Sequence, residues 1–361
     1  MESASNYLPP VPITVLTGFL GSGKTTLLTR LIRQPAMART VVIVNEFGEV
    51  GLDHHLVAEA SGNTVLLDSG CVCCTMLSDL SATLRDLHRR RMVGEIPDFD
   101  RVVIETTGLA DPGPILHTLM TDRVILGYFK LDGVVTTVDA VHGLGQLNRN
   151  TESMTQVAVA DRIVVTKTDL ASSASLSLLK SRLREMNPAA SIQESDSSEV
   201  TGLLMFESAN YSLDPEHLDV DRWLKAEAYD HRDNHAHHPD HRHDDDDNIS
   251  SRHHDAIDSF CLTSEKPVRW GALVGFLDAL TQLRGADLLR VKGLVDVEES
   301  DLPVVIQGVE HLFHPPSQLQ SWPDSDRRSR VVFITRNLTR EPIEDLFRIC
   351  VAAVEAKEAP L

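Results

Sequence analysis

The chain is poor in basic residues and has no long apolar run. Its 361 residues include 34 Lys and Arg against 53 Asp and Glu, which gives a formal net charge of −19. A nucleic-acid partner needs a basic surface that displaces counterions, and an anionic membrane attracts clusters of Lys and Arg, so we expect neither partner. No apolar run reaches the roughly 20 residues of a membrane-spanning helix. Residues 1–15 also lack the basic start and apolar core of a secretory signal.

Cysteine is scarce as well. The chain contains 5 cysteines, too few at this length for a disulfide framework. We therefore expect a cytoplasmic protein with reduced thiols. Cys71, Cys73 and Cys74 nevertheless crowd into the stretch GCVCC, so this segment requires an explanation of its own.

Apolar residues are plentiful and follow a regular pattern in the first part of the chain. They make up 42% of all residues, enough for a substantial core. Nearly continuous apolar runs, typical of strands buried on both faces of a parallel sheet, alternate with helical patterns. The expected strands are residues 12–18, 40–46, 63–69, 101–107, 133–139 and 161–167, and the apolar stripe of Leu27, Leu28, Leu31 and Ile32 predicts a helix after the first. The alternation predicts a doubly wound, mostly parallel α/β domain over residues 1–205.

Residues 206–256 differ sharply in composition. The stretch His231–His254 holds 8 of the 16 histidines, together with the acidic run Asp244–Asp247. Such a segment buries too little apolar surface to offset its ordering entropy, so we expect a flexible linker. Its imidazoles either collect Zn²⁺, Ni²⁺ or Co²⁺ loosely or belong to a segment that only keeps the protein soluble.

The last part of the chain returns to mixed strand and helix patterns. Strands are expected at residues 258–264, 288–297, 303–313 and 327–336, and helices at residues 270–283 and 341–356. This mixture predicts a small α+β domain over residues 257–361. Cys261 and Cys350 lie within a strand and a helix pattern, so we expect both to pack in this domain.

A phosphate-binding motif follows the first expected strand. GFLGSGKTT, from Gly18 to Thr26, fits the pattern G-x-x-x-x-G-K-[ST] and opens a helix, which is the context that this motif requires. Its glycines turn backbone N–H groups toward phosphates, and the helix N-terminus adds partial positive charge. Lys24 provides a charge for the β- and γ-phosphates, and the Thr25 hydroxyl provides a ligand for Mg²⁺. The nucleotide-binding residues expected here are Gly18, Gly21, Ser22, Gly23, Lys24, Thr25 and Thr26.

A carboxylate ends the strand at residues 101–107. Glu105 can hold the Mg²⁺ shell or one of its waters, and Gly108 can present a backbone N–H to the γ-phosphate. At the first position of such a motif, here ETTG, the usual residue is Asp. The longer side chain of Glu105 favours a contact with the magnesium ion through water over direct coordination. The alternative is a carboxylate that caps the next helix. We assign Lys24, Thr25 and Glu105 to catalysis.

The sequence TKTD follows the strand at residues 161–167. Asp169 can accept hydrogen bonds from guanine N1–H and the exocyclic amine, which adenine does not offer in the same pattern, and this selects GTP over ATP. Lys167 completes the expected base site. Thr166 stands where the general GTPase pattern has Asn, so an amide that would brace the phosphate loop is absent.

The cysteine cluster admits several interpretations. One interpretation is that the cysteines are buried in the core, and another is that they form a redox pair. Against the redox pair, a disulfide between the adjacent Cys73 and Cys74 is strained, and the thioredoxin sequence context is missing. Three thiolates on a loop suit a soft or borderline ion such as Zn²⁺. Three ligands leave a fourth position for water, another protein ligand or a receiver.

Together these segments resemble the CobW-like metallochaperone GTPases. The resemblance covers nearly the whole chain and rests on TGFLGSGKTTLL, VNEFGEVGLD, GCVCC, ETTGLADP, TKTD, the His-rich insert, LLRVKGLV and RSRVVFITR. It implies a P-loop GTPase domain followed by a small CobW C-terminal domain. It also implies slow GTP hydrolysis coupled to delivery of a metal, most often zinc and sometimes cobalt or iron, to a client metalloprotein.

The resemblance also suggests Glu46 as a further metal ligand beside the cysteines. The alternative is that VNEFGEVGLD is a solvated acidic loop. A cobalt or iron chaperone for cobalamin synthesis or nitrile hydratase activation is the first alternative function. A P-loop kinase or transferase is the second, and Asp169 argues against it. A passive metal store with a vestigial nucleotide site is the third, and the intact Lys24 and Thr25 argue against it.

Overall fold

The structure is a computed structural model that describes residues 9–44, 65–68, 76–196, 200 and 257–358. The chain divides into two compact units, Met1–Val220 with Leu312–Pro315, and Asp221–His311 with Pro316–Leu361. The division after Val220 falls outside the described residues, so the expected limits at 205 and 257 stay predictions. The expected linker, residues 206–256, also lies outside them.

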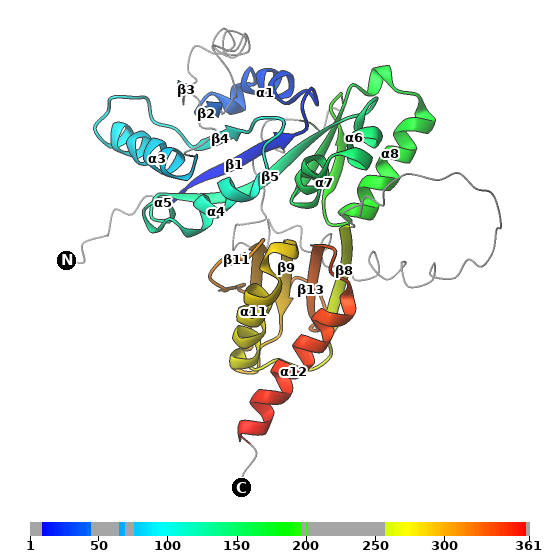
Figure 1. The fold of residues 1–361 in the computed structure, drawn as a ribbon. Coiled ribbons are helices and arrows are strands. Elements are labelled where there is room, and N and C mark those ends of the chain that lie inside the picture. The colour runs from blue at the N-terminus through cyan, green and yellow to red at the C-terminus, as the bar shows by residue number, and fades with distance from the viewer. Residues whose placement is uncertain (1–8, 45–64, 69–75, 197–199, 201–256, 359–361) are drawn as a thin grey trace, which may run out of the picture. The chain divides into compact units, whose positions relative to one another are not determined.

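In the described residues, the first unit is built on a sheet of seven parallel strands in the order β3-β2-β4-β1-β5-β6-β7. The strands are β1 (Val11–Gly18), β2 (Thr40–Val44), β3 (Val65–Asp68), β4 (Arg101–Glu105), β5 (Phe129–Asp139), β6 (Arg162–Thr166) and β7 (Ser191–Glu194). The helices are α1 (Lys24–Ile32), α3 (Met76–Met92), α4 (Gly113–Thr121), α5 (Arg123–Leu126), α6 (Gly143–Arg149), α7 (Thr151–Ala158) and α8 (Ser173–Met186). Helices lie on both sides of this sheet (Figure 1). The expected doubly wound α/β fold is confirmed.

Burial explains why the apolar runs became central strands. Every residue of β2 is buried, as is nearly all of β1 and β4, because helices cover both faces of a doubly wound sheet. The stripe of Leu27, Leu28, Leu31 and Ile32 packs against these strands in one core cluster. Two details differ from expectation. Strand β5 begins earlier, at Phe129, and the short edge strand β7 was not expected at all.

The sheet brings four strand ends to one edge. Parallel register pairs Leu16 of β1 with Glu105 of β4, and Gly18 with Thr137 of β5. Asp139 at the end of β5 pairs with Thr166 at the end of β6. Ligands of open parallel sheets bind outside the carboxyl ends of the strands. The phosphate loop, Glu105 and the TKTD segment therefore lie at the same edge of the sheet.

Residues 257–358 form a small antiparallel sheet with two long helices. Its main strand order is β11-β10-β9-β13-β8, and β12 pairs with β10. The elements are β8 (Ile257–Ser264), α11 (Trp270–Arg284), β9 (Leu288–Val295), β10 (Val304–Val309), β11 (Leu312–Phe313), β12 (Ser317–Gln318), β13 (Ser329–Arg336) and α12 (Arg340–Glu358). Phe276 of α11 packs edge-on against Phe333 of β13 and Phe347 of α12. This is the α+β arrangement that the sequence predicted.

Within the described residues, neither Cys261 nor Cys350 forms a disulfide. Cys261 is buried in β8, as expected for packing. Cys350 is half-buried on α12, and burial raises the pKa of its thiol. A raised pKa keeps the thiol protonated and unreactive at neutral pH. Within the residues that the structure covers, we find no helix with the length and apolar character needed to cross a membrane.

Candidate functional site

The loop between β1 and α1 has the shape of a phosphate-binding turn. Its Ser22 N–H donates to the Phe19 carbonyl over 3.0 Å. Gly23, the residue before α1, has a left-handed φ of +88° that side chains rarely adopt. The Lys24 ammonium donates to the Gly18 carbonyl over 2.9 Å and lies across the loop. The first-turn N–H groups of α1 have no partner within the helix, so this end of α1 attracts anions.

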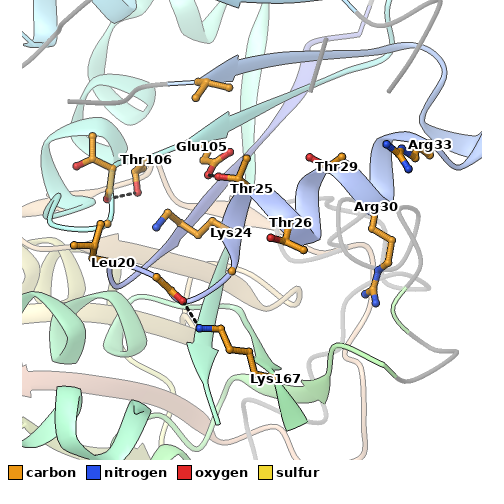
Figure 2. Close-up of a pocket in the computed structure, with 15 residues that line it drawn as sticks. Leu20, Lys24, Thr25, Thr26, Thr29, Arg30, Arg33, Glu105, Thr106 and Lys167 are labelled. Carbon is orange, nitrogen blue, oxygen red and sulfur yellow. Dashed lines mark hydrogen bonds between the residues drawn. The ribbon is translucent and has the colours of Figure 1, made fainter. Parts of the chain in front are cut away.

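A cavity of about 670 Å³ opens beside this loop. Within the described residues it is lined by Leu20, Gly21, Gly23, Lys24, Thr25, Thr26, Thr29, Arg30, Arg33, Val44, Glu105, Thr106, Thr107, Gly108 and Lys167. Figure 2 shows Lys24 at its centre, with α1 carrying Thr26, Thr29 and the two arginines away from the loop. Four basic side chains line the cavity against one acid, although the whole chain is strongly acidic. The cavity therefore suits a polyanionic ligand.

Thr25 and Glu105 form a close pair of oxygen donors at the cavity. The Thr25 hydroxyl donates to Glu105 Oε1 over 2.6 Å, and Glu105 is only 4% exposed. Glu105 does not cap the next helix, because α4 begins at Gly113 after Pro112. A hydroxyl and a carboxylate at one point are hard oxygen ligands of the kind that Mg²⁺ prefers. The residues present therefore fit a magnesium ion bound together with a phosphate ligand.

The turn after β4 forms another wall of the cavity. Gly108 lies so close to the loop that an added Cβ would sit 2.5 Å from Leu20 Cα and 2.6 Å from Leu20 N. Only glycine allows this approach of two backbones. The neighbouring Thr107 hydroxyl is buried and has no hydrogen-bond partner among the described residues. A buried hydroxyl of this kind beside a cavity is consistent with a polar ligand.

Thr166 braces the phosphate loop from behind. Its hydroxyl donates to the Ser22 carbonyl over 2.7 Å, and Ser22 Oγ lies 2.6 Å from Thr137 Oγ1 of β5. The amide that Asn would provide is absent, and the Thr166 hydroxyl provides a brace in its place. A hydroxyl reaches the loop because β6 ends directly behind it, so the shorter side chain is long enough.

Lys167 links the loop to β5. Its left-handed backbone, with φ +56°, turns the ammonium back toward the Gly21 carbonyl at 2.8 Å and Asp139 Oδ2 at 2.7 Å. Figure 2 shows Lys167 approaching the loop from the side opposite Thr25 and Glu105. Burial raises the pKa of Asp139, but hydrogen bonds from Lys167 and from the N–H groups of Val141 and His142 outweigh it and lower that pKa. Asp139 is therefore a buried carboxylate at neutral pH.

The structure brings most of the described candidate residues together. Eight of them line the cavity, namely Gly21, Gly23, Lys24, Thr25, Thr26, Glu105, Gly108 and Lys167. Gly18, at the end of β1, and Ser22, within the loop, are not part of the cavity lining but make hydrogen bonds that support the loop. Asp169 is exposed on the 3₁₀ turn Thr168–Leu170 after β6, next to Lys167 but outside the lining.

The expected metal ligands Glu46, Cys71, Cys73 and Cys74 lie outside the described residues. In the ranges that are described, no group of three or more His, Cys, Asp or Glu side chains is placed to hold a metal ion. The cysteine site therefore stays a prediction.

Three contributors were not recognised from the sequence. Asp139 holds Lys167, Gln156 of α7 bonds to the turn after β4, and Arg30 extends the basic lining. Asp139 had a recognisable signal, because an acid at the carboxyl end of a buried parallel strand faces the ligand edge. Gln156 had none, since it acts through a contact distant in sequence, whereas Arg30 lies on α1, the helix that the phosphate-binding motif opens.

Comparison with known proteins places this site in context. The chain is 33% identical over 338 residues to the zinc chaperone YjiA of Escherichia coli, covering 94% of this chain and 98% of the relative. It is 30% identical to the zinc chaperone CobW of Pseudomonas aeruginosa, covering 96% and 92% of the two chains. The crystal structure of Zn(II)-bound YjiA GTPase from E. coli is similar, with a TM-score of 0.68, 29% identity, and 95% and 99% of the two chains covered.

Two family models match the chain and together span both units. Residues 12–194 match the CobW/HypB/UreG nucleotide-binding domain. Residues 257–351 match the cobalamin synthesis protein cobW C-terminal domain. The protein therefore belongs to the CobW/HypB/UreG family, in the form that carries the cobW C-terminal domain.

Proposed function

We propose that the protein hydrolyses GTP with Mg²⁺ and couples this reaction to delivery of a transition metal to a client metalloprotein. Zinc is the first candidate for this metal. The observation that carries the proposal is the basic cavity at the N-terminus of α1, in which Lys24 and the Thr25–Glu105 pair converge. The cavity is lined by basic side chains although the chain has a net charge of −19. This local positive charge suits a triphosphate ligand.

Within this proposal the phosphate loop, Lys24, Thr25, Glu105 and Gly108 have distinct roles. Backbone N–H groups of Gly21, Gly23 and the first turn of α1 hold the phosphates, and Lys24 neutralises the β- and γ-phosphates. Thr25 and Glu105 are the magnesium ligands, Glu105 directly or through water. When bound, Mg²⁺ withdraws charge from the phosphate oxygens during hydrolysis. Gly108 offers its backbone N–H to the terminal phosphate.

Guanine selection is assigned to Asp169, with Lys167 beside it. Lys167 lines the cavity, and Asp169 lies two residues further on, on an exposed turn at the carboxyl end of β6. An ionised carboxylate that accepts two N–H donors recognises guanine strongly, because charge-assisted hydrogen bonds exceed neutral ones. Adenine presents no such pair of donors.

The metal is proposed to bind as cargo on Cys71, Cys73 and Cys74, with Glu46 or water as fourth ligand. Three thiolates suit Zn²⁺, and Co²⁺ is the next candidate. The described backbone supports this grouping. Strands β2 and β3 are parallel neighbours in which Val44 pairs with Asp68, so the chain leaves the sheet toward Glu46 and toward the cysteines from adjacent points.

The nature of the cargo and the compartment complete the proposal. A relative that covers 94% of this chain is named a zinc chaperone, which favours zinc and a client protein over passive storage. Thiolates must stay reduced to ligate metal, so we assign the protein to the cytoplasm.

The test is phosphate release from the full-length chain with GTP or ATP, combined with zinc binding. Lys24→Ala should abolish hydrolysis and keep zinc binding, because the phosphate and thiol sites use different residues. Lys180→Ala is a matched control, since Lys180 of α8 pairs with Glu194 of β7 and is not part of the cavity lining. Unchanged hydrolysis in Lys24→Ala would contradict the proposed nucleotide site.

A further inference from the structure

Gln156 is a buried amide that reaches the wall of the nucleotide cavity from outside. It lies on α7, is 1% exposed, and donates through Nε2 to the carbonyls of Gly108 at 3.3 Å and Ala110 at 3.0 Å. Both partners are carbonyl oxygens, so only the NH₂ end of the amide can face them. The contact fixes the amide orientation and joins α7 to the turn that follows β4.

Gln156 is itself held on a firm support. Its main-chain carbonyl accepts a hydrogen bond from the buried Thr136 hydroxyl of β5 at 2.7 Å. The end of α7 is fixed by Asn187, whose amide donates to the Val157 carbonyl at 2.9 Å and the Ala158 carbonyl at 3.1 Å. Because the Gln156 backbone is held in this way, its amide group is fixed in place and can orient the turn after β4.

The hydrogen bonds from Gln156 fix the orientation of the Gly108 and Ala110 carbonyl groups. Carbonyl oxygens carry partial negative charge, so a carbonyl that turned into the cavity would repel an anionic phosphate. The bonds to Gln156 hold the carbonyls of Gly108 and Ala110 on the α7 side. Gly108 packs against the Leu20 backbone, so a rotation of its peptide would also disturb the phosphate loop.

The Gln156 side chain is poorly suited to a purely structural role. Its Oε1 is buried and has no hydrogen-bond partner among the described residues. A buried acceptor without a partner is unfavourable, and an apolar side chain of similar length would avoid that cost. The amide is explained if its NH₂ group serves the site.

We infer that Gln156 is a positioning residue that holds the Thr107–Ala110 turn in the arrangement that reads the terminal phosphate, and so sets the preference for the triphosphate over the diphosphate. This inference rests on the proposed function, because it assumes that Gly108 faces the terminal phosphate. It adds a residue on α7 that touches no nucleotide.

The test compares affinities for a non-hydrolysable GTP analogue and for GDP, each with Mg²⁺, by calorimetry on the full-length chain. Gln156→Met keeps the length and removes both donors. It should weaken binding of the analogue at least tenfold and binding of GDP less than twofold. Gln146→Met, at a half-buried position on the preceding helix α6, should change neither. A general loss of structure would lower both affinities equally.

A second variant keeps the test decisive if Gln156→Met folds poorly. Gln156→Glu places a carboxyl beside the same two carbonyls, and burial there raises its pKa. Once protonated it has one donor, so the preference for the analogue should recover as the pH is lowered. Equal losses for both nucleotides in a variant that unfolds like the wild type, or no loss at all, would overturn the role of Gln156. A wild-type chain that binds neither nucleotide would contradict the proposed function instead.

Discussion

Asp139 Oδ2 lies 2.7 Å from the Lys167 ammonium, and the pair joins the ends of β5 and β6 behind the phosphate loop. The carboxylate is 2% exposed and the ammonium 37%. Lys167 also donates to the Gly21 carbonyl. One buried acid therefore fixes the lysine of the proposed base site and, through it, the phosphate loop.

Replacing Asp139 by Asn should lower stability by roughly 1–2 kcal/mol, because solvent partly screens the lysine. The folded pKa of Asp139 is lowered. Its stabilisation is therefore complete above its ordinary pKa of 3.8 and is lost as the pH falls through the folded value. Urea unfolding from pH 7 to pH 3 should show the wild-type advantage shrinking only at the acidic end. Asp86→Asn, which removes an exposed ion pair with Arg89, is the control, and an advantage independent of pH would contradict the assignment.

Gly108→Ala tests the close approach of the two backbones. The new Cβ would meet Leu20 at 2.5 Å, so the loop or the turn must shift. We expect at least a tenfold loss of GTP affinity, measured by calorimetry. Gly275→Ala on α11 adds a Cβ where no atom lies within 4 Å, and it should stabilise the helix by about 0.5–1 kcal/mol. Wild-type affinity in Gly108→Ala would show that this turn does not border the bound nucleotide.

Thr166→Val removes the brace on the phosphate loop and keeps the side-chain shape. It leaves the buried Ser22 carbonyl without its 2.7 Å donor, at a cost of about 1–3 kcal/mol. Thermal unfolding should show this loss, and GTP affinity should fall with it. In Thr281→Val the lost hydroxyl bonds to its own helix, at the Leu277 carbonyl, so nucleotide affinity should not change. Equal effects in the two variants would refute the brace.

Asp169→Ala tests the choice of base. The wild type should prefer GTP over ATP by at least tenfold, since each hydrogen bond to a charged acceptor contributes roughly 1.5–3 kcal/mol. The variant should bind both nucleotides about equally. Competition binding measures the ratio directly, and a wild type without preference would remove guanine selection from the account.

The fold was predictable where burial dictated the pattern. Strands β1, β2, β4 and β6 are nearly continuous apolar runs because helices cover both faces of the sheet. Strand β7 was missed because it is a four-residue edge strand, Ser191–Glu194, with one buried residue. A half-buried strand of this length has too few residues to show alternation.

The site was predictable to the extent that its motifs are local. The phosphate loop can be recognised directly in the sequence because its glycines, Lys24 and Thr25 lie within one short motif. Gln156 lies 48 residues from Gly108, and nothing near it in the sequence indicates the contact. The contact of the Thr166 hydroxyl with the Ser22 carbonyl was not predicted for a related reason, since the distance from β6 to the loop is a tertiary property.

The most direct test of the account measures zinc affinity in the two nucleotide states. Glu46 follows β2 and the cysteines follow β3, which are paired strands, so nucleotide-dependent movement near β2 should alter the metal shell. Coupling is reciprocal, so zinc should change affinity for the GTP analogue by the same factor. Thiols lose protons on ligation, so zinc affinity should also fall as the pH drops. Cys73→Ser is the control that identifies the site.

Zinc affinity should therefore be titrated with the non-hydrolysable GTP analogue and with GDP, in the wild type and in Cys73→Ser. The account predicts different affinities in the two states of the wild type, and a weakened tight site in Cys73→Ser. Identical zinc affinity with both nucleotides, or an unchanged tight site in Cys73→Ser, would contradict it.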